Sequence, residues 1–284
     1  MGIVMGGKLV LKPARLGKIS YINTLPFYHG WLEPDDPISV WEGTPAEINR
    51  AMRAGAVDLA PISSLEYALR QEEYLVFPDL CIGSRDFARS VLLLSHEKIE
   101  GLNRRKIVLS DKSLSSQALL RILLKFKYGF DNEFETSNGT PDHMLAQGNA
   151  ALVIGDEALF YRPEKFVYKY DLSELWWSWT GLPFCFAVWA VRRGFWEENQ
   201  EETVRLYTRL KETTERNMAD LEKLILEGLG MTLADKRFPQ VFGYLFNLIF
   251  HFDSEMRSGL LRFYRDAFRA GLAPEVTSLH MAEV

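Results

Sequence analysis

The chain is 284 residues long, and 47% of its residues are hydrophobic while 25% are charged. This composition excludes a disordered chain, a collagen-like fibre and a coiled coil, and the length suits two lobes of roughly 100–150 residues with a cleft between them. The formal net charge of −5 argues against a nucleic-acid partner, because phosphate binding requires a positive surface. A small-molecule partner is therefore expected.

The N-terminal segment does not read as a targeting signal. Its only apolar run, residues 9–11, is brief and lies between lysines and Pro13, so the apolar region of a secretory signal is missing. No apolar run approaches the ~20 residues that span a bilayer, which predicts a cytoplasmic protein with no membrane partner. Cys81 and Cys185 lie in apolar settings and are expected to be buried free thiols.

Short apolar runs alternate with helical patterns in the first half of the chain, which is typical of βαβ units. Continuous apolar runs indicate strands that are buried on both faces. The predicted strands are residues 18–22, 57–62, 90–95, 106–110, 150–154 and 184–191. Beyond Gly194 the chain is expected to be almost wholly helical.

Helix starts are marked by capping patterns. Thr44, Pro45 and Glu47 form a capping box for a helix that ends at Gly55. Residues 63–66 form a second capping box, for a helix that reaches about Gln71. A third helix is predicted over residues 117–127, with Ser115 or Ser116 as its N-cap.

The order of these elements predicts an α/β protein with mixed, mostly parallel sheets and a discontinuous first lobe. The strand at 90–95 would leave the first lobe and the strand at 184–191 would return to it. The first lobe then comprises residues 1–93 and 190–284, and the inserted lobe comprises residues 94–189. Two crossings of this kind predict closure by hinges.

Ligands of open α/β sheets bind beyond the carboxyl ends of the strands, where helix N-termini present free N–H groups. Small hydroxyl, amide and glycine residues occupy these positions here, and they suit an organic carboxylate bound by neutral donors. They are Asn23, Thr24, Ser63, Ser64, Ser90, residues 113–116, Gly155 and Asp156. Each one has a structural alternative, as a helix cap or as a turn residue.

Other kinds of site are not indicated. The five histidines show no metal-ligand spacing, so neither a metal nor another cofactor is expected. Dinucleotide, Walker and nucleophile-elbow motifs are missing from the sequence. The aromatic run at residues 176–179 is interpreted as core or hinge packing, with a place in the cleft wall as the alternative.

Four sequence blocks, in matching order and spacing, resemble those of the menaquinone-biosynthetic chorismate dehydratases. The likeness extends from about Gly17 to Arg193 and more faintly through the helical tail. The blocks are Tyr21-Ile22-Asn23-Thr24-Leu25-Pro26, Pro61-Ile62-Ser63-Ser64-Leu65-Glu66-Tyr67, Ile154-Gly155-Asp156-Glu157-Ala158-Leu159 and Trp179-Thr180-Gly181-Leu182-Pro183-Phe184.

The resemblance implies the type II periplasmic-binding-protein fold, with a ligand held between two α/β lobes. It also implies the futalosine pathway and the dehydration of chorismate to 3-[(1-carboxyvinyl)oxy]benzoate, without a cofactor. Asn23 and Asp156 are the candidate catalytic residues on this basis. The candidate substrate-binding residues are Ser63, Ser64, Ser90, Ser115, Ser116, Gly155, Thr180 and Gly181.

Two alternatives remain at this point. The sister lyase of the pathway, 1,4-dihydroxy-6-naphthoate synthase, has a His-Glu pair where this chain has Gly155 and Asp156, and the missing histidine favours the dehydratase. A solute-binding protein for a small carboxylate would share the fold without any chemistry. Within the dehydratase reading, the base that removes the C3 proton is either Asp156 or the enolpyruvyl carboxylate of the substrate, and substrate assistance is slightly favoured.

Overall fold

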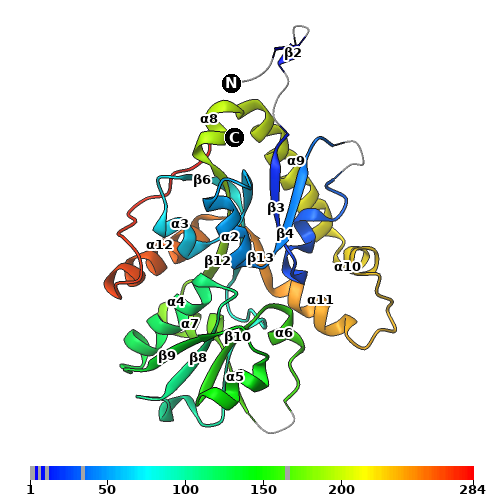
Figure 1. The fold of residues 1–284 in the computed structure, drawn as a ribbon. Coiled ribbons are helices and arrows are strands. Elements are labelled where there is room, and N and C mark those ends of the chain that lie inside the picture. The colour runs from blue at the N-terminus through cyan, green and yellow to red at the C-terminus, as the bar shows by residue number, and fades with distance from the viewer. Residues whose placement is uncertain (1–3, 6–7, 10–12, 33–35, 164–166) are drawn as a thin grey trace.

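The computed structural model describes residues 4–5, 8–9, 13–32, 36–163 and 167–284, and it shows two lobes, one above the other in Figure 1. Each lobe is built on one mixed sheet, so the α/β class and the two-lobed architecture are confirmed. The upper lobe holds a six-stranded sheet, in the order β13 (Leu248–His251), β6 (Tyr74–Ser84), β12 (Phe184–Arg192), β5 (Leu59–Ser63), β3 (Arg15–Ile19) and β4 (Ser39–Gly43). The lower lobe holds a five-stranded sheet, in the order β11 (Tyr168–Asp171), β7 (Val91–Ser95), β10 (Ala150–Ile154), β8 (Lys106–Ser110) and β9 (Glu133–Ser137). A separate pair, β1 (Val4–Met5) and β2 (Lys8–Leu9), precedes them.

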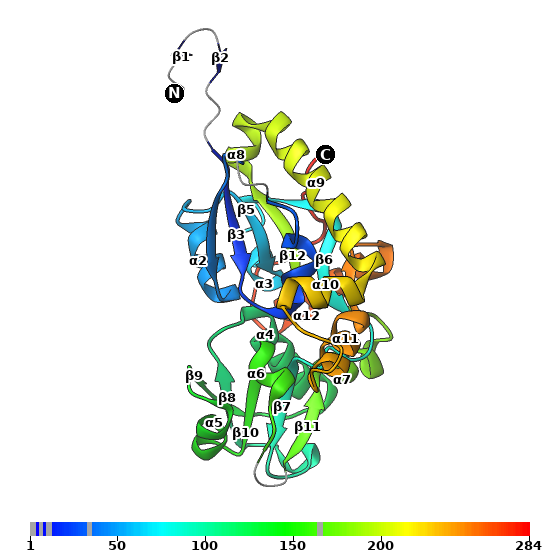
Figure 2. The same cartoon turned by 90° about the vertical axis from the view of Figure 1, so that its right-hand side faces the viewer.

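Helices cover both faces of the two sheets. In Figure 2, α2 lies on one side of the upper sheet and α9 lies on the other. The upper helices are η1 (Ile22–Thr24), α1 (Leu25–Tyr28), α2 (Pro45–Arg53), α3 (Ser64–Leu69), α8 (Arg193–Glu198), α9 (Gln200–Ala219), α10 (Leu221–Leu229), α11 (Phe238–Asn247) and α12 (Ser254–Arg269). The lower helices are η2 (Ile99–Gly101), α4 (Leu114–Ile122), the π-helical turn η3 (Leu123–Lys127), α5 (Pro141–Gln147), α6 (Gly155–Phe160) and α7 (Leu172–Thr180).

The sheets are mixed, but they are not mostly parallel as expected. Within the described residues, β3 pairs in parallel with β4 and β5, and β8 pairs in parallel with β9 and β10. The pairs of β12 with β5 and β6, of β13 with β6, and of β7 with β10 and β11 are antiparallel. The strands next to the crossings are antiparallel to their neighbours. The sequence could not predict this, because an apolar run carries no information about strand direction.

Both predicted lobe boundaries fall inside strands. β7 pairs along its whole length with β10 in the lower sheet, so the boundary expected after residue 93 would divide it. β12 pairs with β5 and β6 in the upper sheet, so the boundary expected at residue 190 would divide that strand. The crossings are instead the connections at residues 85–90 and 181–183. A continuous apolar run indicates burial, but it does not show which sheet a strand joins.

The burial predicted for particular residues is confirmed. Cys81 and Cys185 are free and buried. Trp176 is fully buried and packs edge-to-face against Phe184 and Phe263, so this member of the aromatic run belongs to the core. The predicted strands at 106–110 and 150–154 match β8 and β10.

Two of the three predicted helix N-caps differ in the structure. Thr44 forms the expected capping box with Glu47. α4 begins earlier than predicted, because Ser113 is its N-cap and accepts the Ser116 N–H at 3.3 Å. The capping box at residues 63–66 is wrong, since the Ser63 side chain makes no cap hydrogen bond. Ser63 Oγ instead accepts from Asn49 Nδ2 at 3.0 Å.

The two lobes are joined by hydrogen bonds in which backbone N–H groups of the upper lobe donate to acceptors of the lower lobe. The Leu65 N–H, in the first turn of α3, donates to Ser115 Oγ of the other lobe at 3.0 Å. The Ala46 N–H at the start of α2 donates to the Lys112 carbonyl at 3.2 Å. One lobe thus caps helices of the other, which stabilises the contact between them.

Replacing Ser115 with alanine should lower the free energy of unfolding by about 1 kcal/mol, because the buried Leu65 N–H loses its acceptor. Denaturant unfolding of the purified variant measures this loss. Ser258→Ala is the matched control, since it removes an exposed hydroxyl that bonds only within its own helix. Equal stability of the two variants would contradict the assigned role of Ser115.

Candidate functional site

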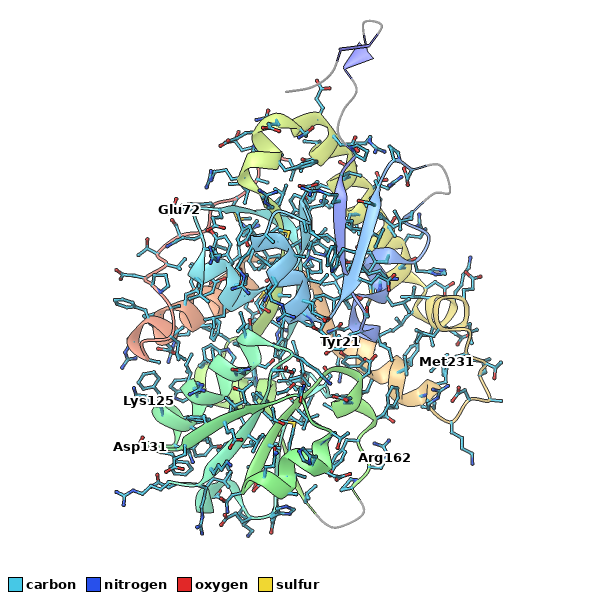
Figure 3. The ribbon with its side chains drawn as sticks, viewed as in Figure 1. Tyr21, Glu72, Lys125, Asp131, Arg162 and Met231 are labelled. Carbon is cyan, nitrogen blue, oxygen red and sulfur yellow. The ribbon has the colours of Figure 1, made fainter. Side chains whose placement is uncertain are left out.

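A cavity that is partly open to solvent lies where the two lobes meet. Figure 3 shows Tyr21, which lines it, at this junction. Its polar lining consists of Tyr21, Asn23, Ser63, Ser90, Ser113 and Ser116. Its remaining lining consists of Ile19, Pro45, Ile82, Val91, Ile154, Gly155, Phe186, Ala187 and Leu248. Among these described residues none carries a charged side chain, so the cavity offers neutral hydrogen-bonding groups in an apolar wall.

The sheet edges bring the polar residues together. Ser63 ends β5 in the upper sheet, whereas Gly155 follows β10 in the lower sheet. Ser90 precedes β7, and because β7 runs antiparallel to β10, Ser90 lies beside Gly155. The Gly155 N–H donates to the Ser90 carbonyl at 2.8 Å. The site therefore follows the rule that ligands of α/β sheets bind at strand ends.

Two nine-residue helices begin at the cavity, one from each lobe. Pro45 is the first residue of α2, and Ser113 and Ser116 belong to the start of α4. The hydroxyls of Ser113 and Ser116 lie 3.0 Å apart. The helix dipole makes such N-termini favourable for anions, although the Ala46 N–H of α2 already donates to the Lys112 carbonyl. Anion binding here would rest on dipoles and hydroxyls instead of on lysine or arginine.

Half of the predicted site residues line the cavity, namely Asn23, Ser63, Ser90, Ser116 and Gly155. Asn23 is well placed for a ligand, since its side-chain oxygen is buried with no hydrogen-bond partner in the described structure. Ser63 is held by Asn49, which both donates to its hydroxyl and accepts its backbone N–H at 3.1 Å.

Four other predicted contacts are placed outside the lining. Ser64 Oγ donates to the Cys185 carbonyl at 2.7 Å, and Ser115 Oγ accepts the Leu65 N–H. Thr180 Oγ donates to the Trp176 carbonyl at 2.9 Å within α7. Gly181 is the left-handed C-cap of the same helix, at φ 67°. Their hydrogen bonds are structural, because each serves a backbone group of the protein.

Asp156 also lies outside the lining, behind Tyr21. Its Oδ1 accepts the Ile22 N–H at 3.2 Å, and this bond joins α6 of the lower lobe to η1 of the upper one. Burial raises the pKa of Asp156 to about 6, against the opposing effect of the Ile22 hydrogen bond. Asp156 faces a second cavity, which also contains Tyr21, Ile22 and Leu25.

Tyr21 covers Gly155 so closely that a side chain at residue 155 would displace the Tyr21 ring. A Cβ atom on residue 155 would lie 2.9 Å from that ring, and the backbone has φ +68°. Both conditions favour glycine. Burial, helped by the negative charge of Asp156, raises the pKa of the Tyr21 hydroxyl, so this group stays protonated at neutral pH.

Sequence reasoning missed several members of the site. Tyr21 opens one of the four quoted blocks and Ser113 stands beside the predicted N-caps, so both were adjacent to a signal. Phe186 belongs to a predicted buried strand, but the run does not show which side chain faces the cavity. Tyr244, whose hydroxyl donates to Ser90 Oγ at 2.9 Å, comes from α11 and had no signal at all.

The two lobes and the cleft between them define an α/β fold of the periplasmic-binding-protein type. A crystal structure of a protein from Archaeoglobus fulgidus is similar, with a TM-score of 0.75 and 17% identity, over 93% of this chain and 99% of that one. The periplasmic aliphatic sulphonate binding protein of Escherichia coli is similar with a TM-score of 0.64 and 14% identity, over 93% of this chain and 89% of that one. Within the described ranges, no helix combines the length and apolar character that a bilayer crossing requires.

The family is identified from sequence. A family described as menaquinone biosynthesis matches residues 14–269. A chorismate dehydratase of Thermus thermophilus is 33% identical over 199 residues, which cover 64% of this chain and 71% of that relative. The chain belongs to the menaquinone biosynthesis family, which confirms the resemblance seen in the four blocks.

Asp156→Asn should remove a pH dependence of stability. The pKa of about 6 in the folded protein lies above the ordinary aspartate value of 3.8, so the folded state favours the protonated carboxyl. The contribution of Asp156 to the free energy of unfolding therefore increases as the pH falls from about 6 to 4, and it decreases as the pH rises again. Asparagine keeps the acceptor for Ile22 and cannot ionise. When the pH is raised from 4.5 to 7.5, the free energy of unfolding of the variant should increase by on the order of 2 kcal/mol relative to that of the wild type.

Denaturant unfolding at the two pH values gives this difference directly. Asp131→Asn, at an exposed aspartate on the lower lobe in Figure 3, is the control and should show no such change. A stability difference between Asp156→Asn and wild type that is the same at both pH values would contradict the raised pKa.

Proposed function

We propose that this protein is a chorismate dehydratase that converts chorismate to 3-[(1-carboxyvinyl)oxy]benzoate and water, and that it acts in the cytoplasm. The observation that carries the proposal is the 33% identity to the Thermus thermophilus dehydratase within the menaquinone biosynthesis family. The neutral, donor-rich cavity between the lobes supports it, because it suits a small organic dianion.

The reaction requires little driving force from the protein. Chorismate carries a hydrogen on C3 and a hydroxyl on C4, and losing both as water makes the ring aromatic. The C3 hydrogen is allylic to the diene that bears the ring carboxylate, so negative charge spreads toward that carboxylate as the proton leaves. The protein must hold two carboxylates, stabilise this charge and assist the departing hydroxyl.

The described residues divide these tasks. The N-terminus of α4, with the hydroxyls of Ser113 and Ser116, forms an anion-binding wall for a carboxylate. Asn23 presents its free carbonyl oxygen, which suits the C4 hydroxyl because a carbonyl accepts hydrogen bonds and cannot donate one to a carboxylate. Contact between the lobes excludes water and strengthens these interactions.

The position of Asp156 favours the substrate as its own base. Asp156 lies outside the cavity lining, and its Oδ1 is engaged by the Ile22 N–H. The enolpyruvyl carboxylate of chorismate is attached through oxygen to C3 and can take the C3 proton within the same molecule. The C3–H electrons then form the new ring double bond as the C4 hydroxyl leaves. In this mechanism Asp156 is a positioning residue that holds η1, the short helix that carries Asn23.

A non-catalytic solute-binding role is the second candidate, because the fold is shared with the sulphonate binding protein of Escherichia coli. The sister lyase, 1,4-dihydroxy-6-naphthoate synthase, is less favoured, because no histidine is present among the described residues that line the cavity. Both alternatives predict that chorismate is left unchanged.

Incubation of micromolar folded protein with chorismate, without added metal or nucleotide, should deplete the ultraviolet absorbance of chorismate. Mass spectrometry should show a product lighter by one water. An unchanged spectrum over hours, with binding of the ligand retained, would identify a solute-binding protein instead.

Asn23→Ala should impair the reaction strongly, whereas Asp156→Asn should change its rate only slightly. Asn23→Ala should lower kcat/KM by roughly 10–1000-fold, the scale of one lost polar contact in a closed site. Asp156→Asn should leave kcat within a few-fold of wild type, because it keeps the acceptor for Ile22. Steady-state kinetics with melting temperatures measured in parallel separates these effects from misfolding. A fall in kcat of ~100-fold or more for Asp156→Asn would make Asp156 the base.

A further inference from the structure

Tyr244 lies next to the cavity and bonds to one of the residues that line it. It is fully buried in α11, a helix that follows the inserted lobe in the chain. Its hydroxyl donates to Ser90 Oγ at 2.9 Å.

The Tyr244 hydroxyl has a single hydrogen, and this sets the direction of its hydrogen bond. A phenol has one hydrogen, and burial raises the pKa of Tyr244, so the group stays protonated. That hydrogen is directed to Ser90. Asn23, which lines the same cavity, has a side-chain oxygen that is buried without a partner in the described structure.

Ser90 keeps its own hydrogen for a further hydrogen bond. Its oxygen accepts from Tyr244, so its own hydrogen remains for another acceptor. Ser90 and Asn23 both line the cavity. Tyr244 thus leaves a donor on Ser90 beside the unpaired acceptor on Asn23, and both are available to a ligand.

We propose that Tyr244 is a positioning residue for the dehydration, which fixes Ser90 as a hydrogen-bond donor toward the substrate. This inference rests on the proposed function. The chorismate dianion has a single donor, the C4 hydroxyl, and several anionic oxygens that only accept. Asn23 matches the hydroxyl that leaves, and Ser90 matches a carboxylate oxygen, so the hydrogen bond from Tyr244 to Ser90 helps to orient the substrate.

A structural role for the Tyr244 hydroxyl is the rival explanation, and the chain offers a matched control. Tyr264 is likewise fully buried, and its hydroxyl has no hydrogen-bond partner in the described structure. Tyr264→Phe and Tyr244→Phe both remove one oxygen from a buried ring. Only the second removes a hydrogen bond to a residue that lines the cavity.

Tyr244→Phe should lower kcat for chorismate by about 10–100-fold, with KM changed by less than about threefold, since it loosens groups whose alignment matters for the reaction. Tyr264→Phe should retain kcat within about twofold. Circular dichroism and melting temperature establish that both variants are folded. A Tyr244→Phe variant that is unfolded while Tyr264→Phe is folded would assign the hydroxyl a structural role and overturn the proposal.

A double-mutant cycle with Ser90→Ala tests whether Tyr244 acts through Ser90. The double variant should be no less active than Ser90→Ala alone, within about twofold, because the tyrosine then has no serine to orient. Multiplication of the two single effects would overturn the proposal. An active wild type with an equally active Tyr244→Phe would overturn this inference alone, whereas a wild type that leaves chorismate unchanged would overturn the proposed function and the inference with it.

Discussion

A buried backbone N–H must find an acceptor, and at the centre of this molecule the acceptor comes from the opposite lobe. The first turn of α3 is completed by Ser115, the start of α2 by the Lys112 carbonyl, and the start of η1 by Asp156. These contacts exist only when the lobes are together. The closed arrangement is therefore held by helix ends that neither lobe satisfies alone, and the same helix ends surround the cavity.

Neutral groups suit this site for a physical reason. A lysine or arginine in the lining would bind a dianion strongly in the ground state and would need its own compensation when the cleft is empty. Helix dipoles and hydroxyls are fixed partial charges that require no counterion. In a cavity walled by Ile82, Ile154 and Phe186, such dipoles act in a low dielectric and can stabilise charge that appears only during the reaction.

The discontinuous chain contributes directly to the chemistry. The segment before the insertion supplies Asn23 and Ser63, the insertion supplies Ser113, Ser116 and Gly155, and the segment after it supplies Leu248. Tyr244 reaches the back of the site from α11, over 150 residues after Ser90 in the chain. Residues this distant along the chain meet because β12 returns to the upper sheet between β5 and β6.

The sequence by itself determined the α/β class, the two lobes and the strand-end positions of Asn23, Ser90 and Gly155, because local patterns of apolar residues and caps decide these features. Its four blocks also indicated the family. Only the tertiary structure decided which sheet β7 and β12 join, that Ser115 caps a helix of the other lobe, and that Asp156 lies behind Tyr21. Each of these depends on a partner far along the chain, and a pattern of neighbouring residues contains no information about such partners. Tyr244 shows this most clearly, since nothing near it in the sequence distinguishes it from any other buried aromatic residue.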